Sequence, residues 1–151
     1  MHTMKEISRL MLKIQLLYSQ WAKQQGLNYN TLAVLFTLAT KGRCTQKQIG
    51  ELWHLPKQTV FSICRQLAEK GHIGFEQNTN GDGREKIMFL TESGTAYAKP
   101  VAEKMQAMET LALQRFGADN SRQLLAQMAR LADILAETMH NRHMMADDTD
   151  R

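Results

Sequence analysis

Hydrophobic residues recur at alternating steps of three and four along most of this chain, a spacing that predicts long amphipathic helices. Over residues 4–24 the repeat forms a heptad-type seam, made of Ile7, Leu10, Met11, Ile14, Leu17, Tyr18 and Trp21. A second helix, capped by Asn28 or Asn30, should run to about Thr40 and is apolar enough to be buried nearly all round. The first seam is too apolar for a lone surface helix, so we expect it to pack against another helix, of a partner subunit.

The C-terminal third carries two further helical patterns. Thr91 is a suitable N-cap for the first, and Pro100 should either bend this helix or mark its true start. Gly117 breaks the pattern, Asp119 is expected to cap the last helix, and from His140 on the polar chain should fray. The apolar positions are Tyr97, Val101, Met105, Met108 and Ala112, then Leu124, Met128, Leu131, Leu135 and Met139. One chain offers too few partners for these seams, so we predict a homodimer with interlocking N- and C-terminal helices.

Residues 45–92 carry shorter elements. Thr45 and Gln48 have the spacing of a capping box at the start of a short helix. His54 and Leu55 make a turn, and Pro56 suits the first position of a longer helix. The apolar stripe of this longer helix is narrow and consists of Val60, Ile63, Cys64 and Leu67. Two helices joined by a tight turn are thus predicted.

A β-hairpin is predicted directly after these helices. Gly71 ends the longer helix as a left-handed residue. Strands should cover residues 72–76 and 86–90, joined by a polar, glycine-containing tip at residues 77–85, and we call this hairpin the wing. The expected fold class is therefore mainly α with a small β wing: a winged helix-turn-helix flanked by long dimerisation helices.

The polar side chains of the longer helix suggest its function. Lys, Gln, Thr, Ser and Arg lie off the apolar stripe, and these types reach base edges and phosphates in a major groove. A solvated amphipathic helix is the alternative for one helix taken alone. The wing adds Arg84 on a thin projecting loop, where a guanidinium suits a narrow minor groove. Asp82 can hold that Arg in one direction through a charge-assisted hydrogen bond.

Two stretches, LPKQTVFSICRQLAEKGHI and GDGREKIMFLTESG, resemble the MarR family of winged-helix transcription regulators, and the resemblance extends over most of the chain. It implies groove-facing roles for part of the longer helix and wing roles for the Asp-x-Arg motif. The DNA-binding residues expected are Lys57, Gln58, Thr59, Phe61, Ser62 and Gln66 in the major groove, and Asp82, Arg84 and Lys86 on the wing.

Phe61 and Ser62 depart from the family pattern. Phe61 stands where members often carry a small polar residue, and Ser62 where many carry a larger or basic one. Phe61 can touch a thymine methyl group, or it can fold back onto the wing. Both alternatives stay open from the sequence.

The resemblance also implies that a small aromatic or phenolic ligand binds where the dimer helices meet the winged domain. Residues near such a pocket would be Tyr18, Trp21, Leu27, Tyr29 and Trp53. The alternative is that these side chains belong to the core. A ligand changes the spacing of the DNA-reading helices only if it binds the two spacings with different affinity.

Composition adds little to this interpretation. The length of 151 residues fits one domain or one dimerising subunit. The formal net charge is +4 and the pI is near 9.2, which is only mildly basic. Residues 41–91 hold eight Lys and Arg against five Asp and Glu, and the difference of +3 suits a polyanionic partner. Ordinary solubility charge is the alternative. Four segments are expected: N-terminal helices at 1–40, the winged DNA-binding region at 41–92, dimerisation helices at 93–140 and a flexible tail at 141–151.

Other chemistry finds little support in the sequence. Catalytic motifs such as a Gly-rich phosphate loop are absent, so we expect no enzyme and no cofactor. Cys44 and Cys64 form no Cys-x-x-Cys pair; Cys64 should be buried, and Cys44 precedes a helix whose dipole can lower a thiol pKa. His140 and His143 lie near the chain end, and we expect no metal site. Free thiols and the lack of a signal peptide or membrane span indicate the cytoplasm.

Three hypotheses follow from the sequence. The first is a dimeric, sequence-specific transcription regulator, a repressor on a pseudo-palindromic operator, whose affinity for double-stranded DNA a small ligand modulates. The second is a winged-helix protein-interaction module without operator binding. The third is a redox or metal sensor that uses Cys or His.

Overall fold

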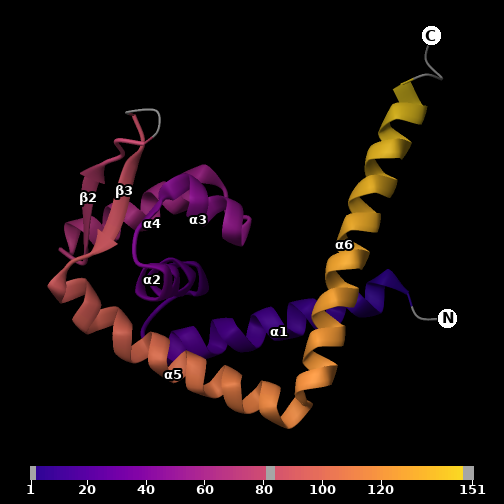
Figure 1. The fold of residues 1–151 in the computed structure, drawn as a ribbon, viewed down its shortest axis with the longest axis horizontal. Helices are drawn as coiled ribbons and strands as arrows, with labels where there is room; N and C mark the ends of the chain where they lie inside the picture. Colours follow the sequence, from indigo (N-terminus) through magenta and orange to yellow (C-terminus); the bar gives the residue numbers. More distant parts are fainter. Residues whose placement is uncertain (1–2, 81–83, 148–151) are drawn as a thin grey trace. The chain divides into compact units, whose positions relative to one another are not determined.

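The computed structural model describes residues 3–80 and 84–147. In these ranges it is mainly helical with a small antiparallel sheet, which confirms the predicted fold class (Figure 1). The helices are α1 (Met4–Gln24), α2 (Tyr29–Lys41), α3 (Gln46–Trp53), α4 (Lys57–Glu69), α5 (Glu92–Phe116) and α6 (Ala118–Asp147). The strands are β1 (Cys44–Thr45), β2 (Ile73–Gln77) and β3 (Lys86–Leu90).

The chain divides into two compact units, residues 1–105 and 106–151. The first unit holds the main core, where α2, α3 and α4 pack with the sheet. The predicted stripe of α4 is buried in it, since Val60 and Cys64 are at most 1% exposed and Leu67 is 3% exposed. Val34 of α2 and Met88 of β3 are fully buried beside that stripe. Burial of this stripe therefore determines which side of α4 faces outward.

The sheet has the order β1–β3–β2, all antiparallel. The sequence did not predict β1, because two residues are too short to show the alternation of a strand. Strand β2 begins one residue later than predicted, at Ile73, and β3 has the predicted bounds. In the wing, Phe75 pairs with Met88 and Gln77 with Lys86. Directly paired residues point to the same face of a sheet, so Phe75 shares its face with the buried Met88.

Local capping accounts for the ends of α3 and α4. Thr45 and Gln48 form the predicted capping box, with the Gln48 amide donating to the Thr45 hydroxyl over 3.1 Å. His54 ends α3 in the left-handed region at φ 51°, and Gly71 follows α4 at φ 76°. Pro56 occupies the N-cap of α4, one position before the expected one.

The start and end of α6 differ from expectation. Asp119 does not cap it: the helix begins at Ala118, and Gly117, at φ 100°, stands before it. Asp119 instead lies in the first turn and pairs with Arg122. The helix continues to Asp147, past the expected end, and residues 148–151 of the expected tail lie outside the described residues.

The predicted start of α5 is confirmed. The Gly94 amide donates to the Thr91 hydroxyl over 3.0 Å, as an N-cap requires. Pro100 lies inside α5 and does not mark its start. Pro100 has no amide N–H, so the carbonyl of Ala96, four residues earlier, lacks its helical hydrogen bond. Ala96 is exposed, so water can donate to that carbonyl instead.

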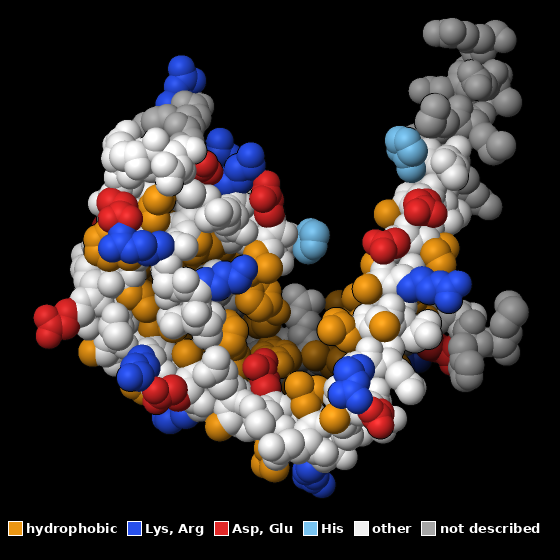
Figure 2. Space-filling view, in the orientation of Figure 1, with side chains coloured by type: hydrophobic (Ala, Val, Ile, Leu, Met, Phe, Trp, Pro, Cys, Tyr) orange, Lys and Arg blue, Asp and Glu red, His pale blue; other side chains and the backbone are white. Residues whose placement is uncertain are grey.

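Several apolar side chains of α1 remain exposed in the first unit. Leu10, Ile14 and Leu17 of the predicted seam are each more than half exposed. In the second unit Leu125 is 73% exposed, and Figure 2 shows hydrophobic side chains along α6. Exposed apolar surface of this extent is typical of helices that pack against another chain. Across the described residues, none of the helices combines the length and the apolar character needed to span a membrane.

A close backbone contact joins the winged region to α5. A Cβ atom built on Gly94 would lie 1.8 Å from the carbonyl oxygen of His72, so α5 can approach the start of β2 only with glycine there. The Thr91 amide donates to the same His72 carbonyl over 3.0 Å, and the rings of His72 and Tyr97 stack at 4.7 Å. The first turns of α5 are thereby fixed to the wing.

Gly94→Ala tests this contact. Helix propensity alone would stabilise the protein by about 1 kcal/mol, whereas the clash with a backbone oxygen should destabilise it by about 1–3 kcal/mol. We expect a lower midpoint of urea unfolding, measured at fixed protein concentration. Thr95→Ala, at the exposed neighbouring position, is the control and should change the midpoint little. A raised midpoint for Gly94→Ala would contradict the close contact.

Candidate nucleic-acid interface

The polar side of α4 is displayed to solvent. Lys57, Gln58 and Gln66 are exposed, while Thr59 and Ser62 are partly buried. These side chains occupy the face left outside the core by the buried stripe. Because they come from one helix with a fixed buried side, their relative positions are set before any partner binds.

Close packing of α3 on α4 sets the turn between them. The Leu55 amide donates to the Gly50 carbonyl over 3.0 Å. A Cβ atom on Gly50 would lie 3.3 Å from the Leu55 carbonyl oxygen and 3.7 Å from Val60. The small residue at position 50 therefore lets the turn fold tightly and leaves the N-terminus of α4 exposed at the surface.

The base of the wing is held by Arg43. Its guanidinium pairs with Glu76 of β2 and lies 5.2 Å from the centre of the Phe89 ring of β3. One cation thus contacts both strands of the hairpin. Arg84 and Lys86 are exposed further along the wing, and Asp82 lies outside the described residues, so its predicted contact with Arg84 does too. Figure 2 shows Lys and Arg side chains near the wing tip.

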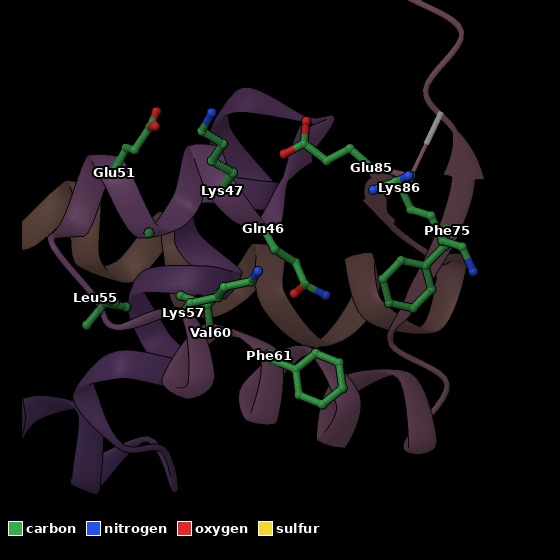
Figure 3. Close-up of a pocket in the computed structure, with 12 residues that line it drawn as sticks. Gln46, Lys47, Glu51, Leu55, Lys57, Val60, Phe61, Phe75, Glu85 and Lys86 are labelled. Carbon is green, nitrogen blue, oxygen red and sulfur yellow. The ribbon is translucent and has the colours of Figure 1, made fainter. Parts of the chain in front are cut away.

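A hollow of about 850 Å³ lies among α3, α4 and the wing, and we call it the wing hollow (Figure 3). Its lining residues come from all three elements: Gln46, Lys47, Gly50, Glu51, Leu55, Lys57, Val60, Phe61, Phe75, Arg84, Glu85 and Lys86. Four of these carry positive charge and two carry negative charge, which leaves a net charge of +2. The structure thus brings Lys57 and Phe61 of α4 together with Arg84 and Lys86 of the wing around one concave surface.

Two cations are absent from the expected list of DNA-binding residues. Arg65 is exposed on the outer side of α4, where it pairs with Glu69 at 3.7 Å. The sequence pattern placed Arg65 off the apolar stripe with the other polar residues of α4, although the list of DNA-binding residues omits it. Lys47 lines the wing hollow from α3, and no local pattern in the sequence indicated this, because its place depends on how α3 and the wing pack.

The residues expected near a ligand pocket are packed beside the core. Tyr18, Trp21 and Leu27 contact a small cluster formed by Ala22, Leu32 and Met105. The Tyr18 and Tyr29 rings meet edge to face at 6.3 Å. Trp53 packs on the main core, and its indole nitrogen donates to the Thr37 hydroxyl over 2.7 Å.

Both cysteines are buried and poorly suited to redox sensing. Burial raises the pKa of the Cys44 thiol, contrary to the expectation that a helix dipole lowers it. For Cys64 burial, and secondarily the nearby Cys44, raises the pKa to about 12. The thiolate is the species that reacts with oxidants, so both side chains behave as small hydrophobic residues of the core.

Comparison with known proteins places this geometry in a family. A family model, described as the MarR family, matches residues 25–85. The structure of NMB1585, a MarR family regulator from Neisseria meningitidis, shares 38% identity with a TM-score of 0.85, and the match covers 94% of this chain and 99% of that one.

Two more distant structures share the fold. MepR of S. aureus, solved as a DNA complex, has 20% identity and a TM-score of 0.69, over 89% of this chain and 99% of that one. PcaV, a transcriptional regulator of Streptomyces coelicolor solved with its natural ligand, has 22% identity and a TM-score of 0.66, over 87% and 92% of the two chains.

Two helices joined by a tight turn and followed by a β-hairpin define a winged helix-turn-helix fold. The chain belongs to the MarR family, as its match to NMB1585 over nearly its full length shows. It is therefore a DNA-binding transcription regulator and not an enzyme.

The buried thiols give a direct test of the local structure. At pH 8 a thiol with a pKa of about 12 is ionised in on the order of one molecule in ten thousand. Native protein should therefore react with Ellman's reagent at least about tenfold more slowly than protein unfolded in guanidinium. Equal rates in the two states would contradict the burial of Cys44 and Cys64.

Proposed function

We propose that this MarR-family regulator is a homodimeric repressor that reads a pseudo-palindromic operator and whose DNA affinity is modulated by a small ligand. The observation that carries the proposal is that an outward polar α4 and a cation-bearing wing line one concave surface. A major groove admits an α-helix, and a wing placed beside that helix meets the neighbouring minor groove.

In this proposal α4 enters the major groove. The base- and phosphate-contacting residues are Lys57, Gln58, Thr59, Phe61, Ser62 and Gln66, to which the exposed face of α4 adds Arg65. Arg84 and Lys86 of the wing contact the minor groove and its phosphates, with Asp82 orienting Arg84. The structure of MepR, which was solved bound to DNA, supports a DNA-binding role for this fold.

The exposed apolar seams supply the argument for a dimer. Side chains such as Leu10, Ile14 and Leu17 of α1 stay more than half exposed in a single chain, and a second copy would cover them. We therefore assign dimerisation to residues 1–40 and 93–140 and DNA reading to residues 41–92. A two-fold dimer presents two copies of α4, so the operator should be an inverted repeat with half-sites about ten base pairs apart. A dimer bound to an operator that overlaps the promoter would repress by blocking access of the polymerase.

Ligand control is assigned to five residues on or beside α1, α2 and α3, of which Tyr18 and Trp21 pack on the small cluster and Trp53 on the main core. Tyr18, Trp21, Leu27, Tyr29 and Trp53 are partly buried. Tyr and Trp combine a large apolar surface with one polar atom, which suits an aromatic or phenolic ligand. PcaV, solved with its natural ligand, supports a ligand-binding role for this fold. A ligand would weaken repression if it binds more tightly to a dimer whose α4 helices are wrongly spaced for DNA.

Arg84→Ala separates DNA reading from a protein-interaction role. Loss of a wing cation from both subunits should weaken binding about tenfold on any sequence. It should also reduce the slope of log affinity against log salt by up to about two, because two fewer phosphates are neutralised. Fluorescence anisotropy with a labelled duplex at several salt concentrations measures both effects.

Lys99→Ala is the matched control, since Lys99 is an exposed cation on α5 that lies outside the wing hollow. It should leave affinity and salt slope close to those of the natural protein. If Arg84→Ala behaves like this control, the wing does not contact DNA and the interaction-module hypothesis gains support.

A further inference from the structure

Two aromatic side chains are exposed in the wing hollow beside its charged residues. Phe61 of α4 is 51% exposed and Phe75 of β2 is 40% exposed, and both line the wing hollow. Figure 3 shows the two rings among the polar and charged side chains around them. Removing exposed phenyl rings from water is favourable, so these two rings would be stabilised by an apolar partner bound in the hollow.

Each ring belongs to an element whose neighbouring residues are buried in the core. Phe61 follows Val60, which is 1% exposed and lines the same hollow. Phe75 lies two residues after the buried Ile73 and opposite the buried Met88, so all three share one face of the sheet. Phe75 therefore continues a buried face of the sheet to the surface, and Phe61 lies on the exposed side of α4 next to a buried residue.

The charges around the rings identify the kind of partner. Lys47, Lys57, Arg84 and Lys86 line the hollow, against Glu51 and Glu85. With α4 in a major groove and the wing at the adjacent minor groove, the DNA strand between the two grooves passes over this hollow. The phosphates of that strand would meet the lysines and Arg84, and its neighbouring base edges would meet the rings.

The edge of a base pair in the major groove offers one apolar group, the C5-methyl of thymine. On that edge the C5 substituent of a pyrimidine lies nearer the backbone of its own strand than the C4 substituent does. A ring on the flank of α4 beside that backbone can reach C5 without entering the centre of the groove. The same methyl group is present on 5-methylcytosine and absent from cytosine and uracil.

We propose that Phe61, supported by Phe75, reads a pyrimidine C5-methyl group, so that each operator half-site carries a thymine at the position facing the N-terminal part of α4. The proposal rests on the proposed function and adds a specificity-determining pair to it. In this proposal Phe61 contacts the methyl group, and Phe75 of the wing adds apolar surface on the other side of the same hollow.

Deoxyuridine substitution tests the proposal directly. An operator selected by the natural protein is resynthesised with each thymine in turn replaced by deoxyuridine, which removes the methyl group and keeps every hydrogen-bonding atom. At one thymine per half-site the affinity should fall about fourfold, the effect expected for one buried methyl group. Phe61→Ala should bind both duplexes equally, Phe75→Ala should show a reduced ratio, and Phe61→Leu should retain a preference for the methylated base.

Leu52→Ala provides the matched control, because Leu52 is an exposed apolar residue of α3 that lies outside the hollow. It should keep the full fourfold ratio. A second pair of duplexes, with cytosine or 5-methylcytosine at the same position, separates the two sources of the methyl group. Tighter binding to 5-methylcytosine shows that the methyl group alone is read, and a response confined to the thymine–deoxyuridine pair identifies thymine.

Two results would overturn the proposal. The first is that every thymine of the operator can be replaced by deoxyuridine without loss of affinity. The second is that Phe61→Ala still binds the thymine duplex fourfold more tightly than the deoxyuridine duplex. If Phe61→Ala loses affinity without any deoxyuridine effect, the ring contacts the sugar–phosphate backbone. Failure to select any operator refutes the proposed function itself, which is a different outcome from an operator that is bound and indifferent to deoxyuridine.

Discussion

Burial of one narrow stripe on α4 is the constraint on which the rest of the structure depends. Val60, Ile63, Cys64 and Leu67 pack into the core formed with α2 and the sheet. A fully buried Val, Ile or Leu contributes about 1.5–3 kcal/mol, and together these residues leave α4 one stable rotation about its axis. The polar residues of α4 then face outward without further restraint, and the hollow beside the wing follows from the same packing. The residues that α4 presents to a partner are thus determined by which of its residues the core buries.

Much of this fold could be predicted because its signals are local. The capping box at Thr45, the left-handed Gly71 and the stripe of α4 each depend on residues within one or two turns, so they are readable from the sequence. Strand β1 and the wing hollow could not be predicted, since they depend on antiparallel register and on how α3 meets the wing. Phe75 shows the difference: its strand was predicted, but only its pairing with Met88 reveals which face it occupies.

The candidate site divides in the same way. The outward residues of α4 follow from helical periodicity, whereas Lys47 joins them only through tertiary packing. The exposed seams of α1 and α6 extend the argument beyond a single chain, because they are apolar surfaces that the described fold leaves open. A second copy that covers them would also set the distance between two α4 helices, which links dimer geometry to DNA spacing.

The most direct measurement is a selection of random duplexes on the purified protein near physiological salt, followed by titration of the selected sequence. Operator recognition by a two-fold dimer predicts an inverted repeat with half-sites about ten base pairs apart, bound by one dimer. A pool that stays random after repeated rounds, with only weak binding that disappears as salt is raised, would contradict sequence-specific reading by α4 and the wing.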